Sequence, residues 1–320
     1  MDATARIGNT PAHGPTWMGR KTGVLNPMRA WALILTCILA ASSAGQAGAA
    51  AEPAPLPAII APEAWGEPSF EDSFQTLDAG ADQTRPARPH RWRTVMGYGG
   101  AASVDNRKIG GSSLGVDRAF RGADNGAPVG IDPFATGPQG LTITARRVDP
   151  AMQARLFGRA WASGQLTTRF TFAQLYGYFE AEMDLPVCQK GAWPAFWLLP
   201  AKGPWPRYGE IDGPETIGNG KIYWTTHMQD KGRSGQVEIV TPGDCTRGWH
   251  RYGALWRPDS IGFYYDRRLI GHMPTPPGLT EPMYMILDLG VGGSWPGEPD
   301  PAATQITMRV RQVAAWPMPR

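Results

Sequence analysis

Three acidic residues that stand close together in the chain, Glu210, Asp212 and Glu215, could do chemistry. In a β-strand the side chains of Glu210 and Asp212 project from the same face. Glu215 lies five residues beyond Glu210, so a regular strand would place it on the other face, whereas one extra residue in a β-bulge returns it to the first. The intervening Gly213-Pro214 pair suits a bulge, because neither residue favours the interior of a central strand. The spacing therefore predicts three carboxyl groups on one surface.

Carboxyl groups this close repel one another when ionised, and the repulsion raises the pKa of at least one of them. One ionised and one protonated carboxyl group are what glycoside hydrolysis requires. A separation of about 5–5.5 Å between them would give retention of configuration through a covalent glycosyl-enzyme. A solvated acidic turn and a calcium site are the alternatives that the spacing leaves open.

Aromatic residues surround this acidic segment. Trp193 and Trp197 share one strand parity, and Trp205 and Tyr208 lead into Glu210. Broad aromatic faces stack on the apolar faces of sugar rings, although the ordinary role of any single Trp is packing in the core. We expect these four side chains to bind substrate, with Trp197 the one among them that also suits the core.

The elements that must position these residues are strands. The chain of 320 residues contains 40 Gly and 31 Pro, a composition that favours turns and disfavours a helical bundle. Apolar and polar residues alternate, or apolar residues run on, in segments 141–146, 176–185, 252–256, 261–265, 284–289 and 306–311. Within the second segment Phe179, Ala181, Met183 and Leu185 face one way, while Tyr178, Glu180, Glu182 and Asp184 face the other. Such a pattern predicts an all-β sandwich or barrel.

The N-terminal part reads as an export signal. An apolar run at residues 30–41 follows Arg29, and Ala47-Gly48-Ala49 has the small-x-small pattern of a cleavage site. The run is short for a bilayer span, so an uncleaved anchor is the lesser alternative. We expect a signal peptide over residues 1–49, cut near Ala49–Ala51.

The rest of the chain divides into a linker and one domain. Residues 50–64 are rich in Ala and Pro and suggest a short extended tether. Residues 65–320 suit one large sandwich. We expect this mature protein to be secreted, extracellular or periplasmic, without stable membrane insertion, and to be a monomer.

The net charge of +3 belongs to the export segment. The first 49 residues hold four basic side chains and one acidic side chain, and the remaining chain is balanced. No bulk electrostatic attraction to nucleic acid is then left, and we expect no nucleic-acid partner.

Two cysteines, Cys188 and Cys245, remain after residue 49. An oxidising compartment permits a disulfide, and the two positions meet if the strands that flank them are antiparallel neighbours. Two unpaired small hydrophobic side chains are the alternative.

Several motifs, taken in order, resemble glycoside hydrolase family 16. They span about half the chain, with weaker similarity at residues 70–74, and are found at residues 176–181, 192–197, 210–215, 249–252 and 289–297. The resemblance implies a concanavalin-like β-jelly-roll sandwich with a concave substrate cleft. The form of its acidic motif is typical of laminarinase-like members, and the C-terminal half also resembles bacterial members that trim exopolysaccharides.

The resemblance also implies roles for individual residues. Glu210 would be the nucleophile, Glu215 the general acid/base, and Asp212 the hydrogen-bonding partner that tunes the nucleophile. His227 would support the carboxylates, or be a neutral structural histidine, and Trp295 would bind substrate.

The implied activity is that of a retaining endo-β-glycosidase on a β-1,3- or β-1,3-1,4-linked polysaccharide. It needs no cofactor, allows a structural Ca²⁺, and has no catalytic metal. A transglycosylase, a non-catalytic glycan-binding module and a calcium-stabilised envelope protein are the alternatives. Gly213-Pro214, Asp288 and Arg267 depart from the family pattern, and Asp288 bears most on substrate preference.

Overall fold

The computed structural model describes residues 54–81, 90–95, 111–230 and 233–319. The expected signal peptide over residues 1–49 and its cleavage site lie outside this range. Within the described residues, no helix has the length and apolar character needed to cross a bilayer. Residues from Glu52 to Arg320 form one compact unit.

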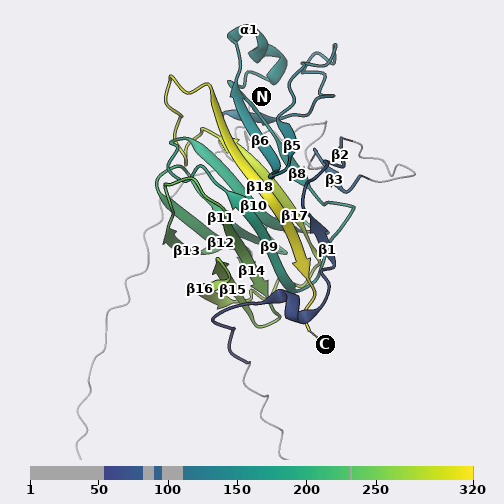
Figure 1. The fold of residues 1–320 in the computed structure, drawn as a ribbon, viewed down its shortest axis with the longest axis vertical. Coiled ribbons are helices and arrows are strands. Elements are labelled where there is room, and N and C mark those ends of the chain that lie inside the picture. The colour runs from purple at the N-terminus through teal and green to yellow at the C-terminus, as the bar shows by residue number, and fades with distance from the viewer. Residues whose placement is uncertain (1–53, 82–89, 96–110, 231–232, 320) are drawn as a thin grey trace, which may run out of the picture. The chain divides into compact units, whose positions relative to one another are not determined.

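Two large sheets make up this unit (Figure 1). In the described part of the chain, the first runs β16 (Arg268–Pro274), β15 (Ser260–Tyr265), β14 (His250–Trp256), β9 (Gly177–Asp184), β18 (Gln305–Trp316), β6 (Gly140–Arg147), β7 (Trp161–Ser163), β4 (Ser113–Gly115), with β1 (Phe70–Asp72) on β18 and β5 (Phe134–Gly137) on β6. The second runs β13 (Arg233–Pro242), β12 (Lys221–Asp230), β11 (Glu210–Glu215), β10 (Ala192–Pro200), β17 (Met283–Val291), β8 (Gln165–Thr167), β3 (Trp92–Arg93), β2 (Ala79–Gly80). Short helical turns occur at η1 (Pro62–Trp65), α1 (Pro150–Gln153) and η3 (Ala154–Leu156).

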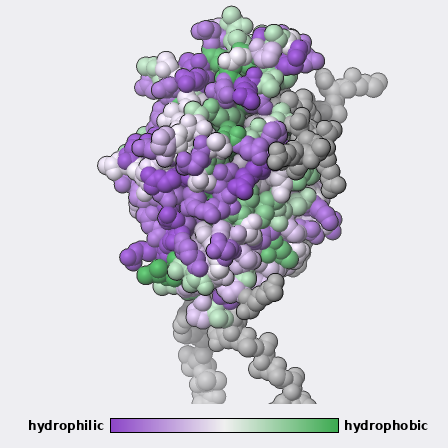
Figure 2. Space-filling view, turned by 45° about the vertical axis from the view of Figure 1, so that its right-hand side comes forward, coloured by the Kyte–Doolittle hydropathy of each residue, from purple (hydrophilic) through white to green (hydrophobic). Residues whose placement is uncertain are grey.

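The main hydrophobic core is built from the inner faces of both sheets. Phe179, Ala181 and Met183 of β9 belong to it, together with Phe196 of β10 and Leu287 of β17. The period-two alternation of these strands sends every second side chain inward. The expected all-β jelly-roll sandwich is therefore confirmed, while the concavity of its substrate cleft stays a prediction. On the side shown in Figure 2, hydrophilic residues cover most of the described surface and apolar ones form smaller areas.

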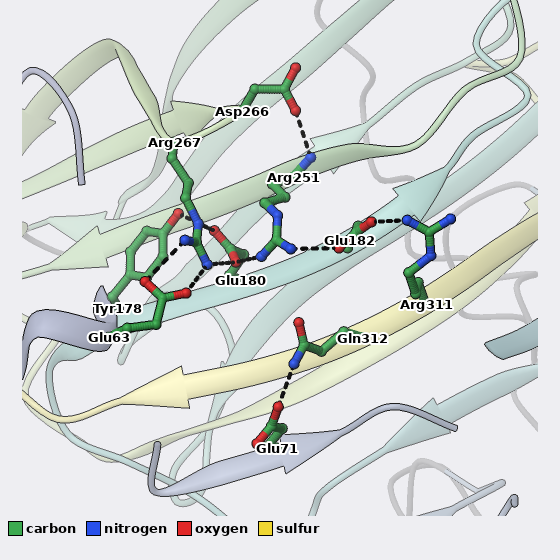
Figure 3. A network of polar contacts seen from close by, with 10 residues as sticks. All are labelled: Glu63, Glu71, Tyr178, Glu180, Glu182, Arg251, Asp266, Arg267, Arg311 and Gln312. Carbon is green, nitrogen blue, oxygen red and sulfur yellow. Dashed lines mark hydrogen bonds and ion pairs between the residues drawn. The ribbon is translucent and has the colours of Figure 1, made fainter. Parts of the chain in front are cut away.

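The outward face of β9 differs from a solvated polar face. Glu180, Glu182 and Asp184 are almost completely buried. Buried carboxylates need charged partners, and arginines supply them: Arg251 donates to Glu180 at 2.9 Å and lies 2.8 Å from Glu182. Figure 3 shows Glu180 and Glu182 among the arginines that cover them.

Arg267, which departs from the family pattern, belongs to this network. Its backbone has a φ of 63° in the turn between β15 and β16, a conformation that favours glycine. Its guanidinium makes two hydrogen bonds of 2.9 Å to Glu180 and one of 3.0 Å to Glu63. These bonds offset the strained backbone conformation.

The segment expected to be a linker is, from residue 54 onward, part of the folded unit. Ile60 is buried against Tyr264, and the Tyr264 hydroxyl donates a hydrogen bond to the Pro57 carbonyl at 2.9 Å. The Leu269 backbone N–H donates to the Ala58 carbonyl at 2.9 Å. Composition suggested a tether because Ala and Pro are common in linkers, but Leu56 and Ile60 supply apolar contacts that hold this stretch on the sheet.

Cys188 and Cys245 are joined in a disulfide with a Cα–Cα distance of 5.3 Å. Cys188 follows β9 and Cys245 precedes β14, and these two strands are antiparallel neighbours. The structure therefore has the strand pairing on which the disulfide prediction depended.

Candidate active site

The three carboxyl groups are positioned by β11 and its bulge. Asp212 and Glu215 are three residues apart, but their partners on β12, Thr225 and Tyr223, are only two apart. The same irregularity occurs against β10, where Ala195 opposes Glu215 and Trp197 opposes Asp212. One extra residue on β11 therefore returns Glu215 to the face that carries Asp212, as the spacing predicted. We call this face of the second sheet the site face.

Gly213 allows the bulge to pack tightly. A Cβ atom at this position would lie 2.6 Å from Cε3 of Trp224, a fully buried side chain of the core. The Phe263 ring lies next to the same point, at 3.4 Å. The bulky Trp224 therefore fills the space that a larger residue at position 213 would need.

We expect Gly213→Ala to destabilise the protein by about 1–3 kcal/mol, because the methyl group would overpack a site bounded by a rigid indole. Chemical denaturation measures this free energy of unfolding. Gly235→Ala is the control, because a Cβ there meets nothing within 4 Å. Equal stability of the Gly213→Ala variant and the control would contradict this account of the bulge.

Tryptophan side chains hold two of the three carboxyl groups. The indole N–H of Trp193 donates to Glu215 at 2.9 Å. Trp205, which is 58% exposed, donates its N–H to Glu210. Each bond fixes one carboxyl oxygen.

His227 completes the group around Asp212. Strand pairing sets His227 of β12 opposite Glu210, and its Nε2 lies 3.2 Å from Oδ2 of Asp212. Its ring also packs near Trp205, with 6.1 Å between centroids. His227 therefore contacts the carboxylate cluster, as the resemblance implied.

Among the described residues, Glu210, Asp212 and His227 form a set whose ligand atoms could hold a metal ion, all within 4.8 Å of one another. These are the same groups that the resemblance assigns to catalysis. An ion bound there would occupy the lone pairs that a nucleophile and its partner need. Catalysis by these carboxyl groups and a resident metal ion at the same set therefore exclude each other.

Burial and mutual repulsion dominate the electrostatics of the cluster. Burial raises the pKa of Glu215 to about 7, against the hydrogen bond from Trp193, which lowers it. Burial and the neighbouring Asp212 charge raise the pKa of Glu210 well above its usual range. Burial and the Glu215 charge also raise the pKa of Asp212. At neutral pH the cluster therefore keeps protons, and Glu210 and Asp212 share a hydrogen bond.

Trp295 and Trp197 were also predicted to bind substrate, and they differ in what they pack against. Trp295 is 38% exposed and meets Trp193 edge to face, with 5.3 Å between ring centroids. Trp197 lies on the site face opposite Asp212 but packs partly on Leu199 and Ile286.

Among the described residues, Tyr208 shows no direct contact with the three carboxyl groups. Its ring packs on Gly203 of its own loop, where a Cβ would meet it at 2.1 Å. The Arg207 guanidinium lies 5.6 Å from the ring centroid. Sequence proximity to Glu210 suggested a substrate contact for Tyr208, and this contact stays a prediction.

Tyr223 of the site face was missed as a member of the site, and Asp288 was noted only as a departure from the family pattern that bears on substrate preference. Tyr223 of β12 pairs with Glu215 and contacts Trp295, with 5.1 Å between ring centroids. Asp288 accepts the Trp197 indole N–H at 2.8 Å. The odd spacing of residues 223, 225 and 227 is a signal for Tyr223, but only the strand pairing places Tyr223 next to Glu215.

The protein is an all-β sandwich with a bulged strand that carries three carboxyl groups, two of them hydrogen-bonded to tryptophans. These features are those of a glycoside hydrolase. The sequence model of glycosyl hydrolases family 16 matches residues 132–313, and the chain belongs to this family.

Relatives in two kinds of comparison agree with this assignment. An endo-1,3-1,4-β-glycanase of Rhizobium meliloti is 38% identical over 188 residues, which cover 58% of this chain and 40% of that protein. A β-glucanase of Rhodothermus marinus is 28% identical, over 50% of this chain and 64% of that protein. The matched region thus spans about two fifths of the length of the Rhizobium relatives.

Solved structures share the fold. The laminarinase of Rhodothermus marinus superposes with a TM-score of 0.59 at 25% identity, over 78% of this chain and 97% of that one. The laminarinase catalytic domain of Thermotoga maritima has a TM-score of 0.58 at 21% identity, over 78% and 98% of the two chains.

Proposed function

We propose that this protein is a retaining endo-β-glycosidase that hydrolyses a β-1,3- or β-1,3-1,4-linked glucan. The observation that carries the proposal is the placement of Glu210, Asp212 and Glu215 on one face of the bulged β11 strand, with Trp205 and Trp193 bound to the outer two. The names of the relatives, an endo-1,3-1,4-β-glycanase and a β-glucanase, support the choice of substrate.

In the first step, Glu215 donates its proton to the oxygen of the bond that breaks. Because its pKa is raised to about 7, about half of the Glu215 side chains still carry this proton at pH 7. Glu210 attacks the anomeric carbon and forms a glycosyl-enzyme ester. The proton shared by Glu210 and Asp212 must lie on Asp212 at this moment, so that Glu210 is ionised. The Trp205 N–H stabilises that ionised form.

In the second step, Glu215 is ionised because it has given up its proton. It removes a proton from a water molecule, which attacks the anomeric carbon and releases Glu210. Two inversions leave the β configuration unchanged. The residues supply nucleophile, acid and base, so the mechanism needs no cofactor.

The direct test is product analysis with purified protein on a panel of laminarin, mixed-linkage β-glucan and a galactose-containing exopolysaccharide. We expect reducing ends to appear on a β-1,3-containing polymer, as internal fragments. Binding without reducing ends would instead indicate a glycan-binding module. New, longer oligosaccharides in place of hydrolysis products would indicate a transglycosylase.

The pH dependence of kcat/KM is expected to show a basic limb near pH 7. The acid is active only when protonated, and burial holds the pKa of Glu215 at about 7, above its usual value, so activity falls as the pH rises through that value. Initial rates on the best polymer between pH 4 and 9 measure the limb. Full activity at pH 9 would contradict the role of Glu215 as acid.

We further propose that the protein is exported. The apolar run at residues 30–41 and the Ala47-Gly48-Ala49 pattern support this proposal. Sequencing the N-terminus of the mature protein tests it, with a start near Ala50 expected. Retention of Met1, Met18 or Met28 would contradict cleavage.

A further inference from the structure

The loop after β17, residues 292–298, carries Trp295, and we call it the Trp295 loop. The Trp295 ring lies 5.3 Å from that of Trp193 and 5.1 Å from that of Tyr223, measured between centroids. Trp193 donates its N–H to Glu215, and Tyr223 is the strand partner of Glu215. The indole of Trp295 therefore connects to the proposed general acid through two neighbours, although the loop that carries it is exposed at its tip.

The backbone of this loop needs outside contacts to hold one conformation. Gly292 has a φ of 71° and Gly293 a φ of 109°, values in the left-handed region that glycine adopts without a steric penalty. The same freedom lets a glycine visit many other conformations, so ordering it costs more entropy than ordering any other residue. Contacts beyond the loop's own backbone must therefore offset this cost if Trp295 is to keep its place.

Glu298 supplies such contacts. Its Oε1 atom accepts the Gly293 backbone N–H at 3.0 Å and the Ser112 hydroxyl at 2.6 Å. Ser112 lies 186 residues earlier in the chain and is itself held on the sandwich, since its N–H donates to the Val291 carbonyl at 2.7 Å and its carbonyl accepts the Trp161 N–H at 3.2 Å. A carboxylate accepts hydrogen bonds more strongly than a neutral group does. One oxygen atom therefore joins the two ends of the Trp295 loop to a fixed point.

Close packing shows that this bridge lies directly on the loop. A Cβ atom at Gly292 would lie 2.7 Å from the Ser112 Oγ atom and 2.8 Å from the Glu298 Oε2 atom. Both hydrogen bonds of Glu298 go to the loop and to Ser112 rather than to the three carboxyl groups of the proposed reaction. The contacts of Glu298 therefore connect it to the site through the loop and its Trp295 side chain.

We propose that Glu298 is a positioning residue: its bridge between Gly293 and Ser112 fixes the Trp295 loop and so holds the indole in place for substrate. This inference rests on the proposed function for the role of Trp295, which is to bind the glucan. Without the bridge the loop becomes ordered only when the glucan binds, and the substrate complex and the transition state share this cost equally. KM should therefore rise while kcat stays nearly constant.

The test compares Glu298→Ala with Glu298→Gln on the polymer that the wild-type protein hydrolyses best. Alanine removes the acceptor, and we expect KM to rise about five- to tenfold, with kcat within about twofold of wild type. Glutamine keeps an oxygen in the same place, so KM should stay within about twofold of wild type. Because Glu298 is exposed, both variants are expected to fold.

The Trp295→Ala background shows whether Glu298 acts through the indole. In that background Glu298→Ala should change KM by less than about twofold, since the side chain that it positions is absent.

The matched control is Asp300→Ala. Asp300 is another exposed carboxylate, two residues further along, whose Oδ1 accepts the Ala302 backbone N–H at 2.8 Å outside the Trp295 loop. We expect this variant to keep the wild-type KM and kcat. A second measurement, hydrogen exchange followed by mass spectrometry, does not depend on activity. The peptide that contains residues 292–298 should exchange about fivefold faster in Glu298→Ala, and at the wild-type rate in Glu298→Gln and Asp300→Ala.

The proposal is wrong if Glu298→Ala keeps the wild-type KM, if it raises KM as much in the Trp295→Ala background as in the wild type, or if exchange of the loop is unchanged. An equal rise of KM in Asp300→Ala would also overturn it, because the effect would then reflect surface charge. Failure of the proposed function is seen separately, as absence of hydrolysis by the wild-type protein. The exchange measurement then still decides whether Glu298 holds the loop.

Discussion

The Glu215→Gln variant is expected to lose 10²- to 10⁴-fold in kcat/KM on a polymeric glucan, the usual contribution of a positioned general acid, on the order of 3–5 kcal/mol. The amide keeps the size of the side chain and an oxygen for the Trp193 N–H, so the fold and the bulge should persist. It cannot give a proton to the departing sugar oxygen. Reducing-sugar release at the pH optimum measures the loss.

The leaving group distinguishes an acid from a merely structural residue. An aryl glycoside with an acidic phenol departs without protonation, so its first step should proceed at close to the wild-type rate in Glu215→Gln. Glu238→Gln, an exposed glutamate of β13 on the same sheet, is the control and should retain full activity on both substrates. A uniform loss on both substrates, or none on either, would contradict the assignment of the acid to Glu215.

The Glu210→Ala variant should lose more than Glu215→Gln, on the order of 10⁴-fold or more, and on every substrate. Without Glu210 no covalent intermediate can form, so a better leaving group does not restore the rate. The same pair of substrates measures this difference between the two variants.

A covalent trap provides the second measurement for Glu210. A 2-fluoro glycoside with a good leaving group forms the ester readily but releases it slowly, because fluorine destabilises the oxocarbenium-like transition state. Mass spectrometry of wild-type protein should find the added sugar on the peptide that contains Glu210. A label on Asp212, or labelling that persists in Glu210→Ala, would contradict the role of Glu210.

Burying three carboxyl groups together lowers the stability of the folded state. This penalty explains why tryptophan N–H groups hydrogen-bond to two of them. Burial raises the pKa values of Glu210, Asp212 and Glu215, which means that the fold disfavours their charged forms. Hydrogen bonds from Trp193 and Trp205 offset part of that penalty. The same low-dielectric surroundings that penalise charge make proton transfer by Glu215 effective near neutral pH.

The local sequence was sufficient to predict the features that depend on the spacing of residues along one strand. The period-two alternation in β9 predicted a strand and its inward residues, and the continuous apolar run in β17 predicted a second strand. The five-residue interval between Glu210 and Glu215, with Gly213-Pro214 inside it, predicted the bulge. These features follow from the geometry of one strand, in which each side chain's face is fixed by its position.

Contacts between distant segments were decided by the tertiary structure alone. The indole N–H of Trp197 binds Asp288, 91 residues away, and nothing in either segment specifies the other. The glutamates of β9 were expected to face away from Phe179, but the sequence did not indicate that arginines from β14, β18 and the turn after β15 bury them. Residues 54–64 were expected to be a tether, but they pack on Tyr264. Sequence periodicity determines which face of a strand a residue occupies, whereas its partners depend on which strands become neighbours, and only the folded sheets determine that pairing.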